Sequence, residues 1–358
     1  MKKIVTIVGA RPQFVKAAVV SRALAKFGIG EVIVHTGQHF DENMSAVFFE
    51  EMQIPNPKYN LEISNLSHGA MTGRMLEEIE KILVIEKPDL VLVYGDTNST
   101  LAGALAASKL HIRVGHVEAG LRSFNNLMPE EINRILTDRI ASILFCPTTT
   151  AIENLRKEGY ENFDCQIVNC GDVMQDAAQF YAGISDQRST IIEKLQLERQ
   201  PFVLATIHRQ ENTDDPLKLK SIFDALNEIS KITKVVLPIH PRTSNILSKS
   251  GIKSEFESID PVGYLDMIQL LKNCEMVLTD SGGVQKEAYF FQKHCITLRD
   301  ETEWSELVEK GYNLLAGNDQ ARILEAYHKL RSKSSDFSQN LYGNGHASKT
   351  IAKLLANL

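Results

Sequence analysis

Short apolar segments alternate with longer helical patterns along this chain, and the alternation occurs twice in succession. In the first half, β-branched and apolar residues predict strands at 4–8, 31–35, 90–94, 114–117 and 143–146, with helices at 12–26, 69–85, 100–109 and 130–141. The pattern then restarts, with strands at 203–207, 235–238, 275–278 and 294–298 and helices at 216–229, 263–271 and 284–291. Strand–helix–strand repeats of this kind form parallel sheets with helices on both faces. The sequence therefore predicts an α/β protein with two Rossmann-like, doubly wound domains.

The length of the chain agrees with two domains. At 358 residues it exceeds the usual size of one domain and can build two hydrophobic cores. We place the N-terminal domain at residues 1–168 and the C-terminal domain at 169–345, and we expect a helix at 346–358 to pack back on the first. Open sheets of this type bind ligands at the carboxyl ends of their strands, so we expect the two domains to face each other across a ligand-binding cleft.

Composition limits the partners of the protein. The formal net charge is −6 and no long run of Lys or Arg occurs, which argues against a nucleic-acid partner. No stretch of 18 apolar residues occurs, and Gly9 and Arg11 interrupt the apolar start, so neither a membrane span nor a signal peptide is predicted. The five cysteines lack zinc-type spacing and no HExxH motif is present. This pattern predicts reduced thiols, no metal site and a cytoplasmic location.

A Ser-Gly-Gly turn connects a predicted strand to a predicted helix in the segment 279–287 (TDSGGVQKE). Glycine leaves the backbone N–H groups of such a turn accessible and the helix dipole adds positive potential, so Ser281, Gly282 and Gly283 would suit a diphosphate. Glu287 lies one turn into the helix, within reach of a sugar or ribose hydroxyl. A plain helix N-cap followed by a tight turn would give the same local pattern. The other polar motifs of the chain decide between these interpretations.

Titratable and polar residues follow the ends of several other predicted strands. They are Arg11 with Lys16 in the next helix, Gln38, Asp96, Glu118, His208 with Arg209, and His240, together with Glu130 and Arg134 at i, i+4 on one helix. Any one of them could be a helix cap, a surface ion pair or a structural histidine. Several carboxylates and imidazoles that converge on one ligand site are what acid–base chemistry requires. No GxGxxG fingerprint occurs, so the sequence does not support a nicotinamide mechanism.

Six linked motifs occur in one order along the chain. They are Gly9-Ala10-Arg11-Pro12 with Lys16, Gly95-Asp96-Thr97, His116-Val117-Glu118-Ala119-Gly120-Leu121-Arg122, Pro129-Glu130-Glu131 with Asn133-Arg134, His208-Arg209 with Glu211, and Thr279-Asp280-Ser281-Gly282-Gly283 with Gln285 and Glu287. Together they closely resemble the non-hydrolysing UDP-N-acetylglucosamine 2-epimerases over essentially the whole chain. The resemblance implies a GT-B-like fold, a homodimer, a UDP-sugar substrate held mainly by the second domain, and no cofactor.

The resemblance also implies a reaction. Members of this family interconvert UDP-N-acetylglucosamine and UDP-N-acetylmannosamine by anti elimination of UDP to a 2-acetamidoglucal, followed by re-addition on the other face. Carried over by motif, the catalytic candidates are Asp96, Glu118, Glu130 and His208. The residues that would bind the diphosphate and the ribose are Arg11, Lys16, Arg134, Ser281, Gly282, Gly283 and Glu287. Which carboxylate removes the C2 proton is left open at this stage.

Three positions depart from the pattern common in this family. Gln13 stands where a glutamate is common, Met267 where an aromatic residue lies near the uracil, and Trp304 where an arginine is common. The segments 263–266 and 302–304 resemble the branch that contains UDP-2,3-diacetamidoglucuronate 2-epimerases, so that sugar is the alternative substrate. Bacterial members often bind a second, activating nucleotide sugar, whose site here would use Gln38, Arg74, Arg209 and His240, with Asp41 in place of a usual glutamine.

Two other functions stay open. A GT-B glycosyltransferase would share the UDP site, and a catalytically silent nucleotide-sugar sensor would share the fold. A transferase, however, needs an acceptor groove and at most one base. A sensor has no use for Asp96, Glu118 and Glu130 together. An epimerase accounts for all three carboxylates.

Overall fold

The computed structural model describes residues 2–38, 49, 53–239 and 241–358. The chain divides into two compact units, the first formed by Met1–Gln179 with Asn340–Leu358 and the second by Phe180–Gln339. Each unit contains one sheet, and the strand pairs of both sheets are parallel over the described residues. The prediction of an α/β protein with two doubly wound sheets is therefore confirmed.

The first sheet has seven strands in the order β3-β2-β1-β4-β5-β6-β7. In that order they are Tyr59–Asn60, Gly30–His35, Lys3–Val8, Leu90–Tyr94, Arg113–Val117, Ile143–Cys146 and Gln166–Asn169. β1 pairs with both β2 and β4, so the chain leaves β1 toward one edge of the sheet and later continues on its other side. Ligands of doubly wound sheets bind at such a switch point, beyond the carboxyl ends of the two central strands.

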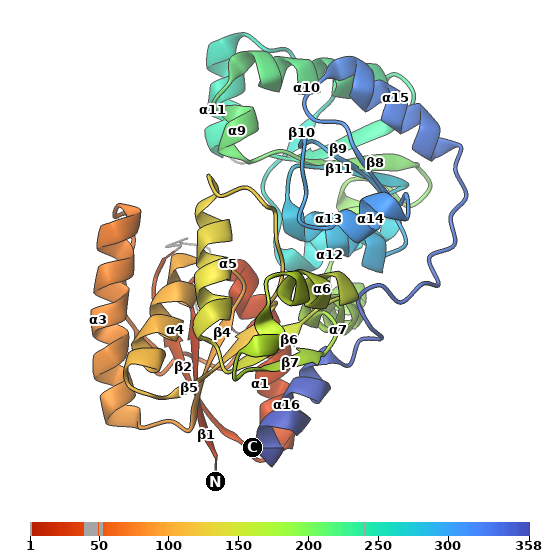
Figure 1. Ribbon diagram of the computed structural model, residues 1–358. Helices are drawn as coiled ribbons and strands as arrows, with labels where there is room; N and C mark the ends of the chain where they lie inside the picture. The colour runs from red at the N-terminus through yellow and green to blue at the C-terminus, as the bar shows by residue number, and fades with distance from the viewer. Residues whose placement is uncertain (1, 39–48, 50–52, 240) are drawn as a thin grey trace. The chain divides into compact units, whose positions relative to one another are not determined.

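Helices cover both faces of the first sheet (Figure 1). One layer contains α3 (His68–Glu86), α4 (Asn98–Lys109) and α5 (Pro129–Ile140), and the opposite face carries α1 (Arg11–Lys26), against which α16 (Ala347–Asn357) packs. α6 (Thr149–Lys157) follows β6, and the single turn η1 (Tyr160–Asn162) and α7 (Val173–Arg188) precede and follow β7. β4 is apolar along its whole length and β1 is apolar apart from Lys3 and Thr6, as expected for central strands of a parallel sheet.

The second sheet has six strands in the order β10-β9-β8-β11-β12-β13, and its switch point lies between β8 and β11. In that order they are Ser258–Ile259, Lys234–Pro238, Phe202–Thr206, Met276–Thr279, His294–Thr297 and Asn313–Leu315. The helices α8 to α15 are Ile191–Lys194, Gln210–Thr213, Pro216–Ser230, Pro241–Ser250, Tyr264–Asn273, Gly282–Phe290, Ser305–Glu309 and Gln320–Arg331. α10 and α15 cover one core, which buries Phe223 and Tyr327, and α8, α12 and α13 cover the core on the other face.

The boundary between the units falls later than the sequence pattern indicates. We predicted a division after residue 168, but the first unit continues to Gln179. It also contains the C-terminal residues from Asn340 onward. The reason lies in the first turn of α7, where Asp176 accepts hydrogen bonds from the N–H groups of Ala347 (3.1 Å) and Ser348 (2.8 Å) at the start of α16. This buried carboxylate connects α7 to the C-terminal helix, so both belong to the first unit.

The predicted central strands agree with the observed strands to within one residue at each end. The prediction omitted β3, β7, β10 and β13, which contain two to four residues each. Segments of two or three residues carry too little apolar alternation to be recognised from sequence alone, and β7 has polar residues at both ends. Within the described parts of the chain, no helix has the length and apolar character needed to cross a bilayer.

Candidate active site

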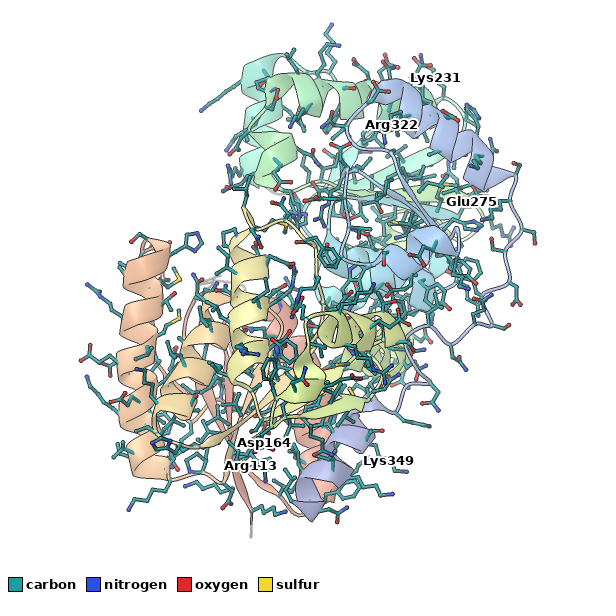
Figure 2. The ribbon with its side chains drawn as sticks, in the orientation of Figure 1. Arg113, Asp164, Lys231, Glu275, Arg322 and Lys349 are labelled. Atoms are coloured by element: carbon teal, nitrogen blue, oxygen red, sulfur yellow. The ribbon has the colours of Figure 1, made fainter. Side chains whose placement is uncertain are left out.

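The charged residues at the two ends of the strands differ in character. At the amino ends, Arg113 at the start of β5 and Glu275 just before β11 are exposed (Figure 2). At the carboxyl ends, Glu118 and Asp280 are 5% and 0% exposed. Burying a charged group is unfavourable unless it is paired or hydrogen-bonded, so buried carboxylates at one edge of a sheet indicate a functional site.

In the first unit, the neighbouring strands β1 and β4 each end in a tight turn. Gly9 follows β1, and a β-carbon at this position would overlap the hydroxyls of Thr36 and Ser99, so only glycine fits. Arg11 then opens α1. Gly95 follows β4 with a φ of +63°, and Asp96 comes next. Because Ile7 of β1 lies beside Val93 of β4, these turns bring Arg11 and Asp96 to the same edge of the sheet.

Helix α5 holds the Asp96 turn from one side. Arg134 Nη2 lies 2.5 Å from Asp96 Oδ2, and Asn133 Nδ2 donates to the Asp96 carbonyl at 2.9 Å. Arg134 Nη1 also pairs with Glu131 Oε2 at 2.9 Å. Glu130, in the first turn of the same helix, is exposed. The guanidinium of Arg134 is therefore buried between two carboxylates, while Glu130 remains accessible to a ligand.

Glu118 comes directly after β5 and forms an ion pair with Lys16 of α1. Its φ is +72°, a left-handed conformation that is costly for a residue with a side chain and that is found mostly at functional sites. The N–H of Glu118 donates to the Phe145 carbonyl at 3.1 Å, which helps to hold this geometry. A β-carbon on Gly95 would lie 3.3 Å from Glu118 Oε2, so Glu118 and Lys16 border the Asp96 turn.

In the second unit, Asp280 connects the ends of β8 and β11. It accepts hydrogen bonds from the backbone N–H groups of His208 (3.1 Å) and Arg209 (3.0 Å) and from Asn212 Nδ2 (3.2 Å). His208 Nδ1 lies 3.0 Å from Asp280 Oδ1. Burial alone would raise the pKa of Asp280, but the bond and charge of His208 and the donors of Arg209 and Asn212 lower it below its usual value. An ionised Asp280 places the Nδ1 proton on His208, whose side chain is 56% exposed, and leaves Nε2 for proton transfer.

The Ser-Gly-Gly turn forms the start of α13, as predicted. Ser281 is its N-cap, and the segment after β12 covers its first turn. Trp304 Nε1 donates to the Gly282 carbonyl at 2.9 Å, and Lys286 Nζ lies 4.0 Å from the centre of the Trp304 ring. A β-carbon on Gly282 would overlap Glu303 Oε1, so the Glu303 side chain lies directly against the backbone of this turn. A side chain at Gly282 would therefore have to displace the end of the Glu303 side chain.

Glu287 lies one turn into α13 and is buried. Its Oε1 accepts a hydrogen bond from the Tyr264 hydroxyl of α12 at 2.8 Å. Gly283, the second residue of α13, is exposed. Glu287 is therefore held in place in part by the Tyr264 hydroxyl.

The residues predicted for a second nucleotide-sugar site lie in both units. Gln38 Oε1 accepts hydrogen bonds from Ser99 N (2.9 Å) and Ser99 Oγ (2.7 Å) near the start of α4. Arg74 is exposed on α3, and Arg209 donates its N–H to Asp280. His240 lies outside the described residues. A role of these residues in activation stays a prediction.

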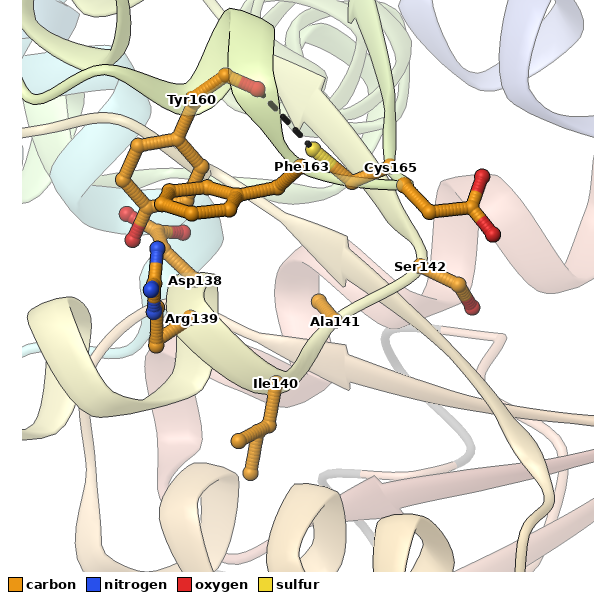
Figure 3. Close-up of a pocket in the computed structure, with 9 residues that line it drawn as sticks. Asp138, Arg139, Ile140, Ala141, Ser142, Tyr160, Phe163 and Cys165 are labelled. Atoms are coloured by element: carbon orange, nitrogen blue, oxygen red, sulfur yellow. Dashed lines mark hydrogen bonds between the residues drawn. The ribbon is translucent and has the colours of Figure 1, made fainter.

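A cavity of about 320 Å³ lies at the amino ends of the strands of the first sheet, where β6 and β7 begin (Figure 3). Arg139 stacks over the Phe163 ring at 3.4 Å there, and Cys165 Sγ contacts the Tyr160 carbonyl at 3.9 Å. None of the residues predicted for catalysis lines this cavity. Over the described ranges, no three His, Cys, Asp or Glu side chains are grouped to hold a metal ion.

Comparison with known proteins decides the family. The model of the UDP-N-acetylglucosamine 2-epimerase family matches residues 22–356. The chain belongs to this family. It is also 58% identical to the UDP-2,3-diacetamido-2,3-dideoxy-D-glucuronate 2-epimerase of Pseudomonas aeruginosa, over 99% of this chain and 100% of that enzyme. The protein is therefore an epimerase, that is, an isomerase, and the resemblance inferred from its motifs is confirmed.

Solved structures of family members have the same fold. The UDP-N-acetylglucosamine 2-epimerase of Methanocaldococcus jannaschii, solved with UDP-GlcNAc and UDP, superposes with a TM-score of 0.90 at 44% identity and covers 100% of both chains. The Neisseria meningitidis UDP-GlcNAc 2-epimerase, solved with UDP-GlcNAc, gives 0.88 at 30% identity, covering 99% of this chain and 100% of that one. The GT-B-like fold class is thus shared with these epimerases.

The structure adds residues to those that the motifs indicated for this epimerase. Asp280 orients His208, and Asn133 holds the Asp96 carbonyl, but neither was among the predicted site residues. Glu131 was set aside in favour of Glu130, yet it accepts hydrogen bonds from Ser123 N (3.0 Å) and Arg134. The Asp280-Ser281 sequence was visible, but the partner of Asp280 lies 72 positions away in the chain and could be found only from the fold.

Replacing Asp280 by Asn tests its role beside His208. The amide removes the negative charge that fixes the Nδ1 proton, so we expect kcat to fall about 10²-fold, the usual scale of positioned acid–base groups, with a smaller change in nucleotide affinity. Steady-state kinetics across pH measure this. Asp215→Asn is the matched control, because Asp215 caps α10 on the surface and asparagine caps helices equally well. Equal kcat and pH profiles in wild type and Asp280→Asn would disprove an orienting role.

Replacing Gly282 by Val tests the α13 turn. The branched side chain would displace the end of Glu303 and cover the N–H groups of the first turn, so we expect UDP affinity to fall by at least roughly 10²-fold while the protein stays folded. Calorimetric titration with UDP measures the affinity, and circular dichroism reports the fold. Gly183→Val is the control, because Gly183 is exposed on α7 with open space around it. Normal UDP binding by Gly282→Val would place the nucleotide elsewhere.

Proposed function

We propose that the protein is a non-hydrolysing 2-epimerase of UDP-2-acetamido sugars, with UDP-2,3-diacetamido-2,3-dideoxy-D-glucuronate as its own substrate. The observation that carries this assignment is the 58% identity to the P. aeruginosa enzyme of that name over the full length of both chains. UDP-N-acetylglucosamine is the second candidate, favoured by the 45% identity to the M. jannaschii UDP-N-acetylglucosamine 2-epimerase over 99% of this chain.

The proposed reaction proceeds by elimination and re-addition. A carboxylate removes the proton at C2 while the C1–O bond to UDP breaks on the opposite face, which gives a 2-acetamidoglucal and free UDP. A proton is then delivered to the other face of C2 as the UDP oxygen bonds again to C1. No net oxidation occurs, because the electron pair of the C2–H bond forms the double bond and returns to hydrogen. Asp96, Glu118, Glu130 and His208 are the proposed acid and base groups.

The ion pairs of the first unit support this scheme. Lys16 is paired with Glu118, and Arg134 is paired with Asp96. Lys16, Arg134 and Arg11 are the proposed ligands of the diphosphate, so binding of a dianion would draw these cations toward the phosphates. The phosphates would then compete with the two carboxylates for these cations when substrate is bound.

The second unit is assigned the nucleotide. The N-terminal turn of α13, with Ser281, Gly282 and Gly283, provides backbone N–H groups and a favourable dipole for the diphosphate. Glu287, held by Tyr264, is assigned the ribose hydroxyls. His208, oriented by Asp280, is assigned proton transfer at the sugar or the leaving oxygen.

Proton NMR in D2O tests both the reaction and the substrate. We expect the product and the recovered substrate to carry deuterium at C2, because the abstracted proton exchanges with solvent on the protein group. Incubation with the diacetamido uronate and, separately, with UDP-N-acetylglucosamine should give a kcat/KM at least roughly 10²-fold higher for the uronate, as expected for a site built to pair specific polar groups. Turnover of UDP-N-acetylglucosamine alone would favour the second candidate, and epimerisation without deuterium would exclude the elimination.

We propose further that the epimerase is a homodimer in the cytoplasm. Its five cysteines are all unpaired thiols, which agrees with a reducing compartment. Exposed apolar side chains cluster on α5 and the loop before it, at Phe124, Leu127, Ile132 and Leu136, with exposures of 75%, 92%, 46% and 46%. A second copy could cover such a surface in a symmetric contact.

Substitution on α5 tests the proposed dimer contact. Leu136→Glu places a charge on the apolar surface of α5, so we expect it to weaken a dimer that uses this surface. Leu217→Glu is the control, because Leu217 is 79% exposed in the second unit. Sedimentation velocity measures the oligomeric state of both variants. A monomeric wild-type protein would disprove the dimer, and an intact dimer in Leu136→Glu would place the contact on another surface.

A further inference from the structure

Four charged side chains form a network beneath the catalytic edge of the first unit. They are His116 on β5, Arg122 in the loop after it, Asp138 on α5 and Glu158 at the end of α6. The side chains of His116, Arg122 and Asp138 are at most 1% exposed, and that of Glu158 is 33% exposed. None of these four residues is among those proposed to touch the substrate, so their charges require another explanation.

The two nitrogens of His116 both face acceptors. Nε2 lies 2.7 Å from the carbonyl oxygen of Gly95, which can only accept, so Nε2 carries a proton. Nδ1 lies 2.6 Å from Asp138 Oδ1. The other oxygen of Asp138 accepts from Arg122 Nη1 at 2.7 Å and from Gly120 N at 3.1 Å. Because Arg122 and Gly120 both donate to Asp138, this carboxylate acts as an acceptor, and the short contact with His116 therefore places a proton on Nδ1 too. Burial would raise the pKa of Asp138, but its charged and hydrogen-bonded neighbours lower it.

We propose that His116 is a positioning residue with a proton on each ring nitrogen, an imidazolium held by Asp138, which fixes the Gly95 carbonyl and with it the Asp96 turn. This assignment rests on the proposed function only in naming Asp96 as a catalytic group. His116 is not itself assigned any contact with the substrate.

The link from His116 to Asp96 is short and is repeated by neighbouring contacts. Gly95 immediately precedes Asp96, and its N–H donates to the Val117 carbonyl of β5 at 2.9 Å. Helix α5 supplies Asp138 to His116, Asn133 to the Asp96 carbonyl and Arg134 to the Asp96 carboxylate. The turn is thus held at three successive points by one helix. Asn133 and Arg134 contact Asp96 directly, whereas Asp138 acts on the turn through the imidazole ring of His116.

The surroundings of His116 tolerate a fixed positive charge because the network is balanced. His116 and Arg122 contribute two cations, and Asp138 and Glu158 contribute two anions. Arg122 joins the anions, with Nε 2.7 Å from Glu158 Oε1 and Nη1 2.7 Å from Asp138. The other nearby titratable groups, Cys146 on β6 and Tyr160 in η1, stay neutral because burial raises the pKa of each. A buried ion pair is stable when its remaining hydrogen bonds are satisfied, as they are here.

Nitrogen-15 NMR of histidine side chains tests the charge of His116 without any substrate. In wild-type protein at pH 7.5 we expect the His116 signals, assigned by their loss in His116→Gln, to show protons on both nitrogens, because each nitrogen faces an acceptor. A His116 with a proton on only one nitrogen would overturn the proposal. The measurement depends on the folded protein alone, so it is independent of whether the proposed epimerisation is correct.

Asp138→Asn tests the consequence for catalysis. The amide can still hydrogen-bond to a neutral His116 and to Gly120, so the fold should persist while the imidazolium is lost. We expect neutral His116 signals and a kcat lowered about 10- to 100-fold at pH 7.5, with KM within about 3-fold of wild type. Asp215→Asn, at the N-cap of α10, serves again as the control. Wild-type kcat in Asp138→Asn with a neutral His116 would show that the charge has no positioning role. A raised KM with unchanged kcat would likewise contradict it.

Discussion

Pairing of buried carboxylates is the constraint on which the whole site depends. An ionised carboxylate that loses its water costs several kcal/mol, unless cations or N–H groups replace that water. Each buried carboxylate at the strand ends has such a partner: Lys16 for Glu118, His116 and Arg122 for Asp138, and His208 with backbone N–H groups for Asp280. Removal of one partner from a buried pair typically costs about 3–5 kcal/mol. The side chains proposed for chemistry therefore also maintain the loops that carry them.

This pairing explains why so much of the site depends on α5. The helix begins at Pro129 and ends at Ile140, and along one face it presents Asn133, Arg134 and Asp138, each of which contacts a strand-end turn. Arg134 and Asp138 are four residues apart and lie on the same face, and Asn133 lies beside that face and reaches the Asp96 carbonyl. The opposite face carries exposed apolar side chains. Ion pairs therefore fix the inner side of α5, and its outer side can contact another protein surface.

The sequence was sufficient for the parts of the fold that depend on local patterns. Uninterrupted apolar runs predicted the central strands, and a Ser-Gly-Gly turn predicted the start of α13. The pairing of Asp280 with His208 and of Asp138 with His116 was not predictable, because each joins residues brought together only by strand order. The end of the first unit was misplaced for the same reason. Asp176 looks like an ordinary helical residue until α16 is known to start beside it.

Two positions at which this chain departs from its family's common pattern are explained by local hydrogen bonding and packing. Gln13 is buried, and its Oε1 accepts from Gly9 N (2.8 Å) and Ala10 N (3.1 Å). Its Nε2 donates to the Tyr94 carbonyl at 2.7 Å, which a glutamate, having only acceptors, could not do when ionised. Gln13 thus ties the turn after β1 to the end of β4 without adding charge.

Trp304 has a comparable local explanation. Its ring receives the buried ammonium of Lys286 at 4.0 Å, and its N–H reaches the Gly282 carbonyl. An arginine at this position would place a second cation beside Lys286 and would lose the aromatic face that stabilises it. Trp304 therefore belongs with Lys286, one turn inside α13, and supports the backbone of the turn that we assign to the diphosphate. Both residues thus hold a strand-end turn in place, Gln13 the turn after β1 and Trp304 the turn after β11.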